Sequence, residues 1–184
     1  YLTPENNYLI PDNYQEDRRY KIVNRTSSTN IGFALLAIVD AYDLKFINVD
    51  ECVKRLKNVF DTILKLEKWN GHLYNWYNIK TLEPLRPRFI STVDSGNFVA
   101  SLYVIKQFLI ELLGLNKYER EIEVKNEELI NEMIETIEKL IVDTDFTVLY
   151  DTSRNLFSIG YAQESGKLVD SYYKRNGVDK PQQN

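Results

Sequence analysis

The chain has 184 residues, of which 43% are hydrophobic and 27% charged, and its formal net charge is −4. This size suits one globular domain with its own core, and the dispersed basic residues argue against nucleic acid as a partner. Cys52 is the single cysteine, so an internal disulfide is excluded. No apolar run of about 18 residues and no signal-peptide pattern is recognised, so a soluble chain is expected.

The first half of the chain predicts a loop followed by two helices. Residues 1–27 hold two prolines and many Asn and Asp without a sustained period, which predicts an extended lead-in. Ser27 or Ser28 is placed to cap a helix that runs to about Tyr42 and is apolar nearly all round. Asp50 is placed to cap a second helix, 51–68, whose apolar residues fall on one face.

The second half begins with a long connection, 69–94, of the kind that often carries function. Asp94 is placed to cap a third, mostly apolar helix over about 95–114, which Gly114 would end. A fourth helix, about 125–142, is amphipathic and acidic. Residues 147–150 and 156–161 then flank a polar turn and predict a β-hairpin.

Along the chain, predicted helices that are apolar on most sides alternate with predicted helices that are apolar on one side only. An α/α toroid produces this order because its inner helices are covered and its outer helices are half wet, whereas a plain four-helix bundle makes all its helices similarly amphipathic. The predicted fold is therefore mainly α, a partial toroid of about two helical hairpins. We expect one partial domain over 1–173 and a divergent, flexible tail over 174–184.

Four polar clusters precede or join the helices. They are Asp12–Asp17, Asn24–Asn30, Tyr74–Tyr77 and Ser91–Asn97. The second and fourth clusters place hydroxyls, amides and free backbone N–H groups at the starts of the two apolar helices, which adjacent inner helices would aim at one mouth of a toroid. Sugar hydroxyls need such groups in a concave site, with aromatic rings against the apolar sugar face. The clusters thus predict a sugar site, and the open alternative is that they are only helix caps beside a packed Trp.

No catalytic group, metal ligand or cofactor is expected from the sequence. Glycosyl transfer needs two carboxylates on opposite sides of one bond, but Glu16 and Asp17 are neighbours, and Asp94 suits a cap or a hydroxyl-binding group. His72 is the only histidine, and no Cys or His spacing indicates a metal site or a catalytic triad. A hydrogen bond within the loop is the expected role of His72, and Cys52 is expected in the core.

Four motifs, in order, resemble successive signatures of the cyclic β-1,2-glucan synthases. They are LIPDNYQED from Leu9, RTSSTNIG from Arg25, GHLYNWY from Gly71 and ISTVDSGN from Ile90. The stretch from Leu149 to Tyr161 resembles the start of the glucoamylase-like part of the same proteins. The resemblance extends from about residue 8 to Tyr173, and Asn24 and Ser28 depart from the His and Pro that this family tends to have.

The resemblance implies a large, membrane-embedded enzyme whose glycosyltransferase part uses UDP-glucose. Its middle, glucoamylase-like part has the (α/α)6 form and closes a linear glucan into a ring by transglycosylation. On this expectation the chain is the N-terminal portion of that middle part and lies in the cytoplasm, with a β-1,2-glucan chain and the remainder of the parent polypeptide as partners. The catalytic glutamates of the family are expected beyond Tyr173, so the chain alone would lack the catalytic pair.

The substrate-binding residues predicted on this basis are polar or aromatic and come from all four clusters. They are Tyr14, Gln15, Glu16, Asp17, Arg25, Thr26, Thr29, Asn30, Asn75, Trp76, Tyr77, Asp94, Ser95 and Asn97. The alternative is a non-catalytic helical scaffold that self-associates through uncovered apolar helix faces.

Overall fold

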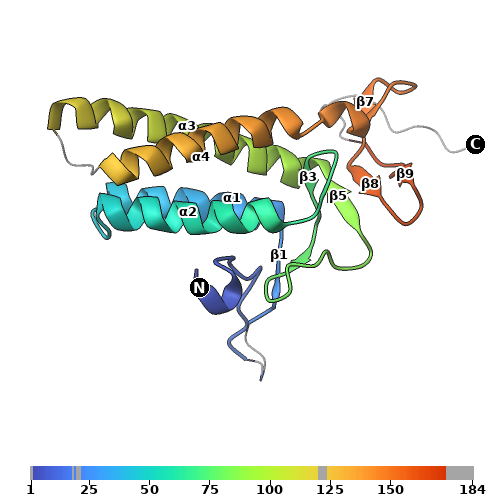
Figure 1. Ribbon diagram of the computed structural model, residues 1–184. Helices are drawn as coiled ribbons and strands as arrows, with labels where there is room; N and C mark the ends of the chain where they lie inside the picture. The colour runs from blue at the N-terminus through green and yellow to red at the C-terminus, as the bar shows by residue number, and fades with distance from the viewer. Residues whose placement is uncertain (1, 18, 20–21, 120–123, 173–184) are drawn as a thin grey trace, which may run out of the picture.

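The computed structural model describes residues 2–17, 19, 22–119 and 124–172, and four helices dominate it (Figure 1). They are α1 (Ser28–Asp43), α2 (Val49–Lys65), α3 (Thr92–Glu119) and α4 (Val124–Asp143). They form two antiparallel hairpins, α1 with α2 and α3 with α4. The hairpins pack on each other through α1 and α3, which make the most extensive contact, and through α2 and α4. Both α1 and α3 begin at the end of the molecule where the short strands lie (Figure 1). The mainly α fold is as predicted, and the predicted tail, 174–184, lies outside the described residues.

Short antiparallel strands and two 3-10 turns connect the helices. The strands are β1 (Arg25–Thr26), β2 (Lys68–Trp69), β3 (His72–Leu73), β4 (Tyr77–Asn78), β5 (Phe89–Ser91), β6 (Tyr150–Asp151), β7 (Leu156–Phe157), β8 (Gly160–Ala162) and β9 (Lys167–Leu168), and the turns are η1 (Pro4–Asn6) and η2 (Phe146–Leu149). β1 pairs with β4, β2 with β3 and β6 with β7, while β5, β8 and β9 form one sheet. The long connection predicted between the second and third helices is therefore partly built of strands.

The first two helix starts show which polar side chain takes the capping position. Ser27 caps α1, since its hydroxyl accepts a hydrogen bond from the backbone N–H of Asn30. Asn48, and not Asp50, caps α2 by accepting from the N–H of Glu51 at 2.9 Å. The prediction for Asp50 was wrong because Asn48 stands two residues earlier at the cap spacing, which leaves the Asp50 carboxylate inside the first turn, where it favours the positive helix end.

The third helix starts earlier and ends later than predicted. The Ser91 hydroxyl accepts from the backbone N–H of Asp94 at 3.2 Å, so Ser91 takes the capping role and Asp94 lies in the first turn. The helix continues through Gly114 to Glu119. A single glycine costs a helix only about 1 kcal/mol relative to Ala, which is too little to end one that is otherwise apolar and packed.

The predicted C-terminal hairpin is present but shorter. β6 and β7 pair across the polar turn, with Tyr150 opposite Phe157. Residues before β6 form η2, and β8 leaves the hairpin to pair with β5, placing Ser91 opposite Gly160. This pairing continues into α3, because the first residue of the helix, Thr92, donates through its N–H to the Ile159 carbonyl (3.0 Å) and through its hydroxyl to the Ser158 carbonyl (2.7 Å).

The core lies between the two helix layers, and α1 and α3 each leave one apolar side uncovered. Leu35 of α1 and Leu102 of α3 are completely buried, whereas Phe33 and Tyr103 are each 57% exposed. The prediction that these two helices are covered on most sides was therefore wrong for the part of the chain that the structure describes, because no described element packs on their second face. Cys52 of α2 is in the core as predicted, and burial raises the pKa of its thiol to about 12.

One helical stretch is longer and more apolar than was expected from the sequence. Within the described residues, Thr92–Gly114 of α3 has the length and the mean hydropathy (1.3) to cross a membrane. One such helix is weak evidence for a membrane span, because the core helix of a soluble protein meets the same criteria. Here α3 packs against both α1 and α4.

Candidate functional site

The two polar helix starts lie side by side. The side-chain amide of Asn97, in α3, donates to the hydroxyl of Thr29, in α1, at 3.1 Å. One turn further along, Gly32 allows the helices this close approach, since a Cβ atom on it would come within 2.6 Å of the Ser101 hydroxyl. The second and fourth polar clusters therefore meet at one end of the helix layers.

The N-terminal lead-in joins this place through Asp12. Its carboxylate accepts from the Arg25 guanidinium and from the Asn30 side-chain amide, each at 3.1 Å, and its backbone N–H donates to the Arg25 carbonyl. Asp12 was not among the predicted site residues, although it belongs to the first polar cluster. The signal that points to it is the need of the half-buried Arg25 for a counter-ion.

The third cluster contributes an aromatic ring. Trp76 is half-buried, and the Arg25 guanidinium lies over its ring, 4.3 Å from the ring centroid. The neighbouring Asn75 donates through its side-chain amide to the Asp94 carboxylate at 3.2 Å. The four clusters are thus connected by hydrogen bonds and one cation–π contact. We call this set the polar rim: Asp12, Arg25, Thr29, Asn30, Asn75, Trp76, Asp94 and Asn97.

Three predicted site residues lie beneath the polar rim. Thr26, Tyr77 and Ser95 are each at most 2% exposed, so none offers surface to a ligand in this structure. The Tyr77 hydroxyl donates to the backbone carbonyl of Glu67 and accepts from the N–H of Tyr74, and burial raises its pKa. Because they are buried, we expect these three residues to support the polar rim from below, and their direct contact with a sugar stays a prediction.

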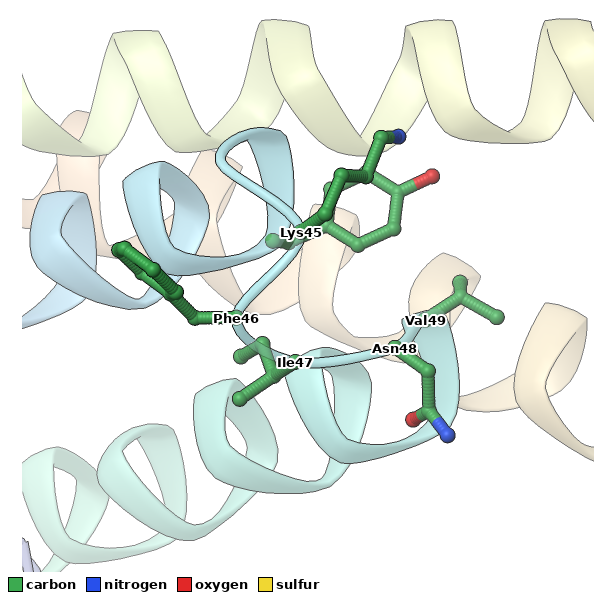
Figure 2. Close-up of a pocket in the computed structure, with 6 residues that line it drawn as sticks. Lys45, Phe46, Ile47, Asn48 and Val49 are labelled. Atoms are coloured by element: carbon green, nitrogen blue, oxygen red, sulfur yellow. The ribbon is translucent and has the colours of Figure 1, made fainter.

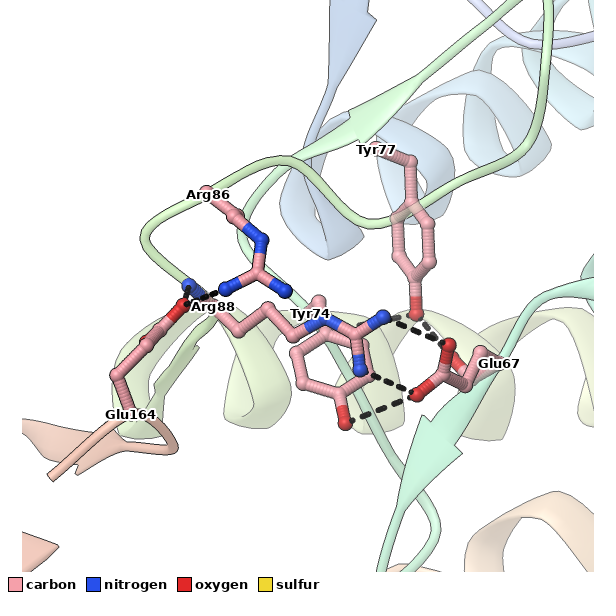
Figure 3. Close-up of polar contacts among 6 residues, drawn as sticks. All are labelled: Glu67, Tyr74, Tyr77, Arg86, Arg88 and Glu164. Carbon is pink, nitrogen blue, oxygen red and sulfur yellow. Dashed lines mark hydrogen bonds and ion pairs between the residues drawn. The ribbon is translucent and has the colours of Figure 1, made fainter. Parts of the chain in front are cut away.

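A polar network around Glu67 holds Tyr74 and Tyr77 in place beneath the polar rim (Figure 3). Arg88 makes two hydrogen bonds to the Glu67 carboxylate, at 2.9 and 3.3 Å, and its guanidinium also lies over the Tyr74 ring. The backbone N–H of Arg88 donates to Glu164 at 2.7 Å. The network therefore ties the connection before β5 to the end of α2 and to the turn after β8.

Of the other residues of the first cluster, Asn13 donates through its side-chain amide to the Asp12 carboxylate at 3.0 Å. Tyr14, Glu16 and Asp17 are exposed on the lead-in, and Gln15 is half-buried. Tyr14 forms a backbone bridge with Ile22. Of this cluster, Asp12 contacts the start of α1 directly, through the Asn30 side-chain amide.

Unmet hydrogen-bonding capacity is concentrated near the polar rim. Four buried side-chain atoms have no hydrogen-bond partner in the part of the chain that the structure describes, and three of them are Thr26 Oγ1, Ser28 Oγ and Asn75 Oδ1. They come from β1, the first turn of α1 and the link between β3 and β4. Buried polar atoms are normally paired, so this concentration distinguishes the place from the rest of the fold.

His72 has the loop role that the sequence predicted. Its Nε2 lies 2.9 Å from the Asp145 carbonyl and its Nδ1 lies 2.9 Å from the Ser95 hydroxyl. Because a carbonyl only accepts, Nε2 carries the proton and Nδ1 accepts from Ser95. Burial lowers the pKa of the imidazole. Among the described residues, no group of three or more His, Cys, Asp or Glu is arranged to hold a metal ion.

The buried His72 makes the stability of the fold depend on pH. Its pKa in the unfolded chain is near the ordinary value of 6.5, and its folded pKa is lower. Below pH 6.5 the unfolded chain therefore takes up a proton that the folded chain does not. We expect the unfolding free energy to fall as the pH is lowered from about 7.5 to about 5.5.

Urea unfolding at the two pH values measures this loss, with His72→Asn as the control. Asn removes the titrating group but keeps a polar side chain, so this variant should lose less stability over the same interval. An equal pH slope in both proteins would show that other groups cause the dependence.

A pocket of about 520 Å³ lies elsewhere, at the opposite end of α1 (Figure 2). It is lined by Tyr42 of α1, by residues 45–48 of the loop between α1 and α2, and by Val49 at the start of α2. The Lys45 ammonium lies 5.2 Å from the centroid of the Tyr42 ring. Since α1 separates it from the helix starts, this pocket is not part of the polar rim.

Comparison with known sequences gives a relative for the greater part of the chain. Over 111 residues, or 60% of its length, the chain is 40% identical to the cyclic β-(1,2)-glucan synthase NdvB of Rhizobium meliloti strain 1021. The resemblance to the cyclic β-1,2-glucan synthases is confirmed. The chain spans 4% of the length of NdvB. No protein-family model matches the sequence.

Solved structures confirm the fold class. A candidate glucoamylase from Bacteroides fragilis NCTC 9343 superposes on 88% of the chain with a TM-score of 0.68 and 18% identity. An endo-β-1,2-glucanase from Chitinophaga pinensis, in complex with sophorotriose and glucose, superposes on 82% with a TM-score of 0.63 and 14% identity. The chain covers 36% and 34% of these structures. It therefore has the fold of one part of a glucoamylase-like α/α toroid.

Proposed function

We propose that this chain supplies glucan-binding loops to a domain that processes β-1,2-glucan. The observation that carries the proposal is the Asn97–Thr29 hydrogen bond, which brings the polar starts of α1 and α3 together beside Trp76 and Asp94. The similarity to NdvB and the likeness in fold to an endo-β-1,2-glucanase support the substrate class.

The chemistry of the polar rim suits a sugar chain. Asp94 offers carboxylate oxygens, and short donors and acceptors come from Thr29 and Asn30 in the first turn of α1 and from Asn97 in the second turn of α3. Trp76 adds the flat apolar surface on which the carbon–hydrogen face of a pyranose ring packs. These groups bind and orient a glucan.

In this proposal the reaction of the parent domain is transglycosylation that closes a linear glucan. Such a reaction needs two carboxylates across the scissile bond, and within the polar rim Asp12 is paired with Arg25 and Asp94 with Asn75. The remainder of the parent polypeptide supplies the catalytic pair, and no cofactor is needed. We place this domain on the cytoplasmic side of a membrane-embedded parent.

Two substitutions test the proposal, Trp76→Ala and Asp94→Ala, made in the protein as its gene encodes it. Each removes a direct contact, so each should weaken binding of linear β-1,2-glucan by about tenfold, which corresponds to about 1.4 kcal/mol. Isothermal titration calorimetry measures the Kd, and circular dichroism checks that the variants fold.

Asp50→Ala is the matched control. Asp50 is also a first-turn acid that accepts from an asparagine amide, Asn126, but it lies on α2 and outside the polar rim. This variant should bind the glucan like the parent protein. If folded Trp76→Ala and Asp94→Ala also retain the parent Kd, the site is wrongly placed.

One observation favours a second function, a non-catalytic scaffold that self-associates. Tyr103, Val104 and Ile110 of α3 are 57%, 53% and 43% exposed, and Phe33 of α1 is 57% exposed. Apolar surface of this kind marks interaction faces. Sedimentation velocity separates the two interpretations of this surface, because a concentration-dependent oligomer with no glucan effect favours the scaffold.

A further inference from the structure

The backbone of Trp76 is fixed on both sides. Before Trp76, the N–H of Asn75 donates to the Phe89 carbonyl at 2.8 Å. The carbonyl of Trp76 itself accepts from the N–H of Leu85 at 2.7 Å. After it, Tyr77 pairs with Thr26 between β4 and β1. These contacts set where the side chain begins, but rotation about its χ angles must be restricted by the side chains around it.

Arg25 is placed to restrict that rotation. Its guanidinium lies 4.3 Å from the centroid of the Trp76 ring. The Asp12 carboxylate holds the guanidinium through its NH2 group, at 3.1 Å, and through Nε, at 3.4 Å. Asp12 is in turn held by Asn30, at the start of α1, and its side chain is only 18% exposed. The arginine is thus attached to the same helix start that bears the polar rim.

We propose that Arg25 is the positioning residue for the ring of Trp76, and that the Asp12–Arg25 pair keeps one face of the indole covered and the ring in a single orientation for a glucose unit. This inference rests on the proposed function, since it assigns a task to the ring that binds the sugar. A guanidinium is planar and weakly hydrated, so it lies flat on an indole, whereas a lysine ammonium is a compact charge without a plane. The task therefore depends on the shape of arginine and not only on its charge.

The experiment compares Arg25→Lys and Arg25→Met in the protein as its gene encodes it, labelled with 5-fluorotryptophan. Trp76→Phe assigns the fluorine resonance of the ring. We expect both Arg25 variants to shift and broaden this resonance, and to weaken binding of linear β-1,2-glucan by about tenfold. Arg55→Met is the matched control, because Arg55 also pairs with a carboxylate, that of Glu51, but on α2. It should leave both the resonance and the Kd unchanged.

The Arg25→Lys variant separates positioning from simple charge pairing. Its ammonium group can still pair with Asp12, so an Arg25→Lys protein that keeps the parent resonance and the parent Kd overturns the inference. An unchanged resonance in Arg25→Met overturns it as well. If Trp76→Ala weakens glucan binding while both Arg25 variants bind normally, only the positioning role fails. If Trp76→Ala itself binds normally, the proposed function fails.

Discussion

Gly71→Ala is expected to lower the unfolding free energy by more than about 3 kcal/mol. Gly71 lies in the turn between β2 and β3 with φ of +79°, a conformation that side chains rarely adopt. A Cβ atom there would lie 2.0 Å from the carbonyl oxygen of Asp143 and 2.7 Å from the backbone nitrogen of Thr144. Because these are backbone atoms at the end of α4, no side-chain movement relieves the clash. Urea unfolding followed by circular dichroism measures the loss.

Gly114→Ala is the control for this substitution. Nothing lies within 4 Å of the Cβ position, and the residue is inside α3. Alanine should stabilise this helix by about 0.5–1 kcal/mol. A loss below about 1 kcal/mol for Gly71→Ala would show that the turn moves away from α4 at little cost.

Leu35→Ala is expected to lower the unfolding free energy by about 3–4 kcal/mol, within the range found for buried leucines. Leu35 is completely buried in α1, a helix that packs on both α3 and α2, and belongs to the hydrophobic core. Truncation removes apolar contacts and leaves a cavity that rigid neighbouring helices fill only partly. Thermal and urea unfolding both report the change.

Phe33→Ala is the matched control on the same helix. Its side chain is larger than that of Leu35 but 57% exposed, so its removal should cost less than about 1 kcal/mol. A loss similar to that of Leu35→Ala would mean that Phe33 is covered in solution, as the self-associating alternative requires. Sedimentation velocity of the parent protein at the same concentration shows whether a second copy of the chain covers Phe33.

The helices and their grouping could be predicted from the sequence because their signal is local. Apolar residues repeat at the helical period in the segments of α2 and α4, and the observed bounds of these helices lie within a few residues of those predicted. The segments of α1 and α3 are long apolar runs that follow a possible capping residue. The contrast between mostly apolar and one-faced helices indicated the toroid. The amount of apolar surface on a helix matches its neighbours in a complete toroid. The sequences of α1 and α3 therefore suggest helices covered on most sides, whereas the helices that the structure describes leave one side of each uncovered.

Apart from the hairpin of β6 and β7, the short strands could not be predicted, because they carry no period of their own. β5 and β8 are three residues each, and the pairing of Phe89 with Ala162 joins segments far apart in the chain. A strand of that length is too short to show alternation. The cap of α1 was predicted correctly at Ser27 or Ser28, whereas the other two predicted caps were wrong for a related reason. Asn48 competes with Asp50, and Ser91 with Asp94, and only the backbone conformation decides which side chain reaches a free N–H.

The polar clusters of the candidate site could be predicted, but the depth of each side chain could not. Tyr77 and Trp76 are adjacent aromatic residues, yet Tyr77 is fully buried and Trp76 is half-buried. The difference arises because Tyr77 pairs with β1 and points its hydroxyl at the Glu67 backbone. The role of Asp12 likewise depends on a loop that folds back to Arg25, which spacing alone does not reveal.

The anchoring of Thr92 bears on the order in which the molecule folds. The first residue of α3 is held by carbonyls of Ser158 and Ile159, and its bond to Ser158 spans 66 residues. Helical turns in the middle of α3 nucleate from nearby residues, whereas a bond across so long a loop closes slowly. We therefore expect the opening turn of α3, with Asp94 in it, to be completed after the chain beyond α4 has docked, which places the candidate site among the parts of the fold that we expect to mature last.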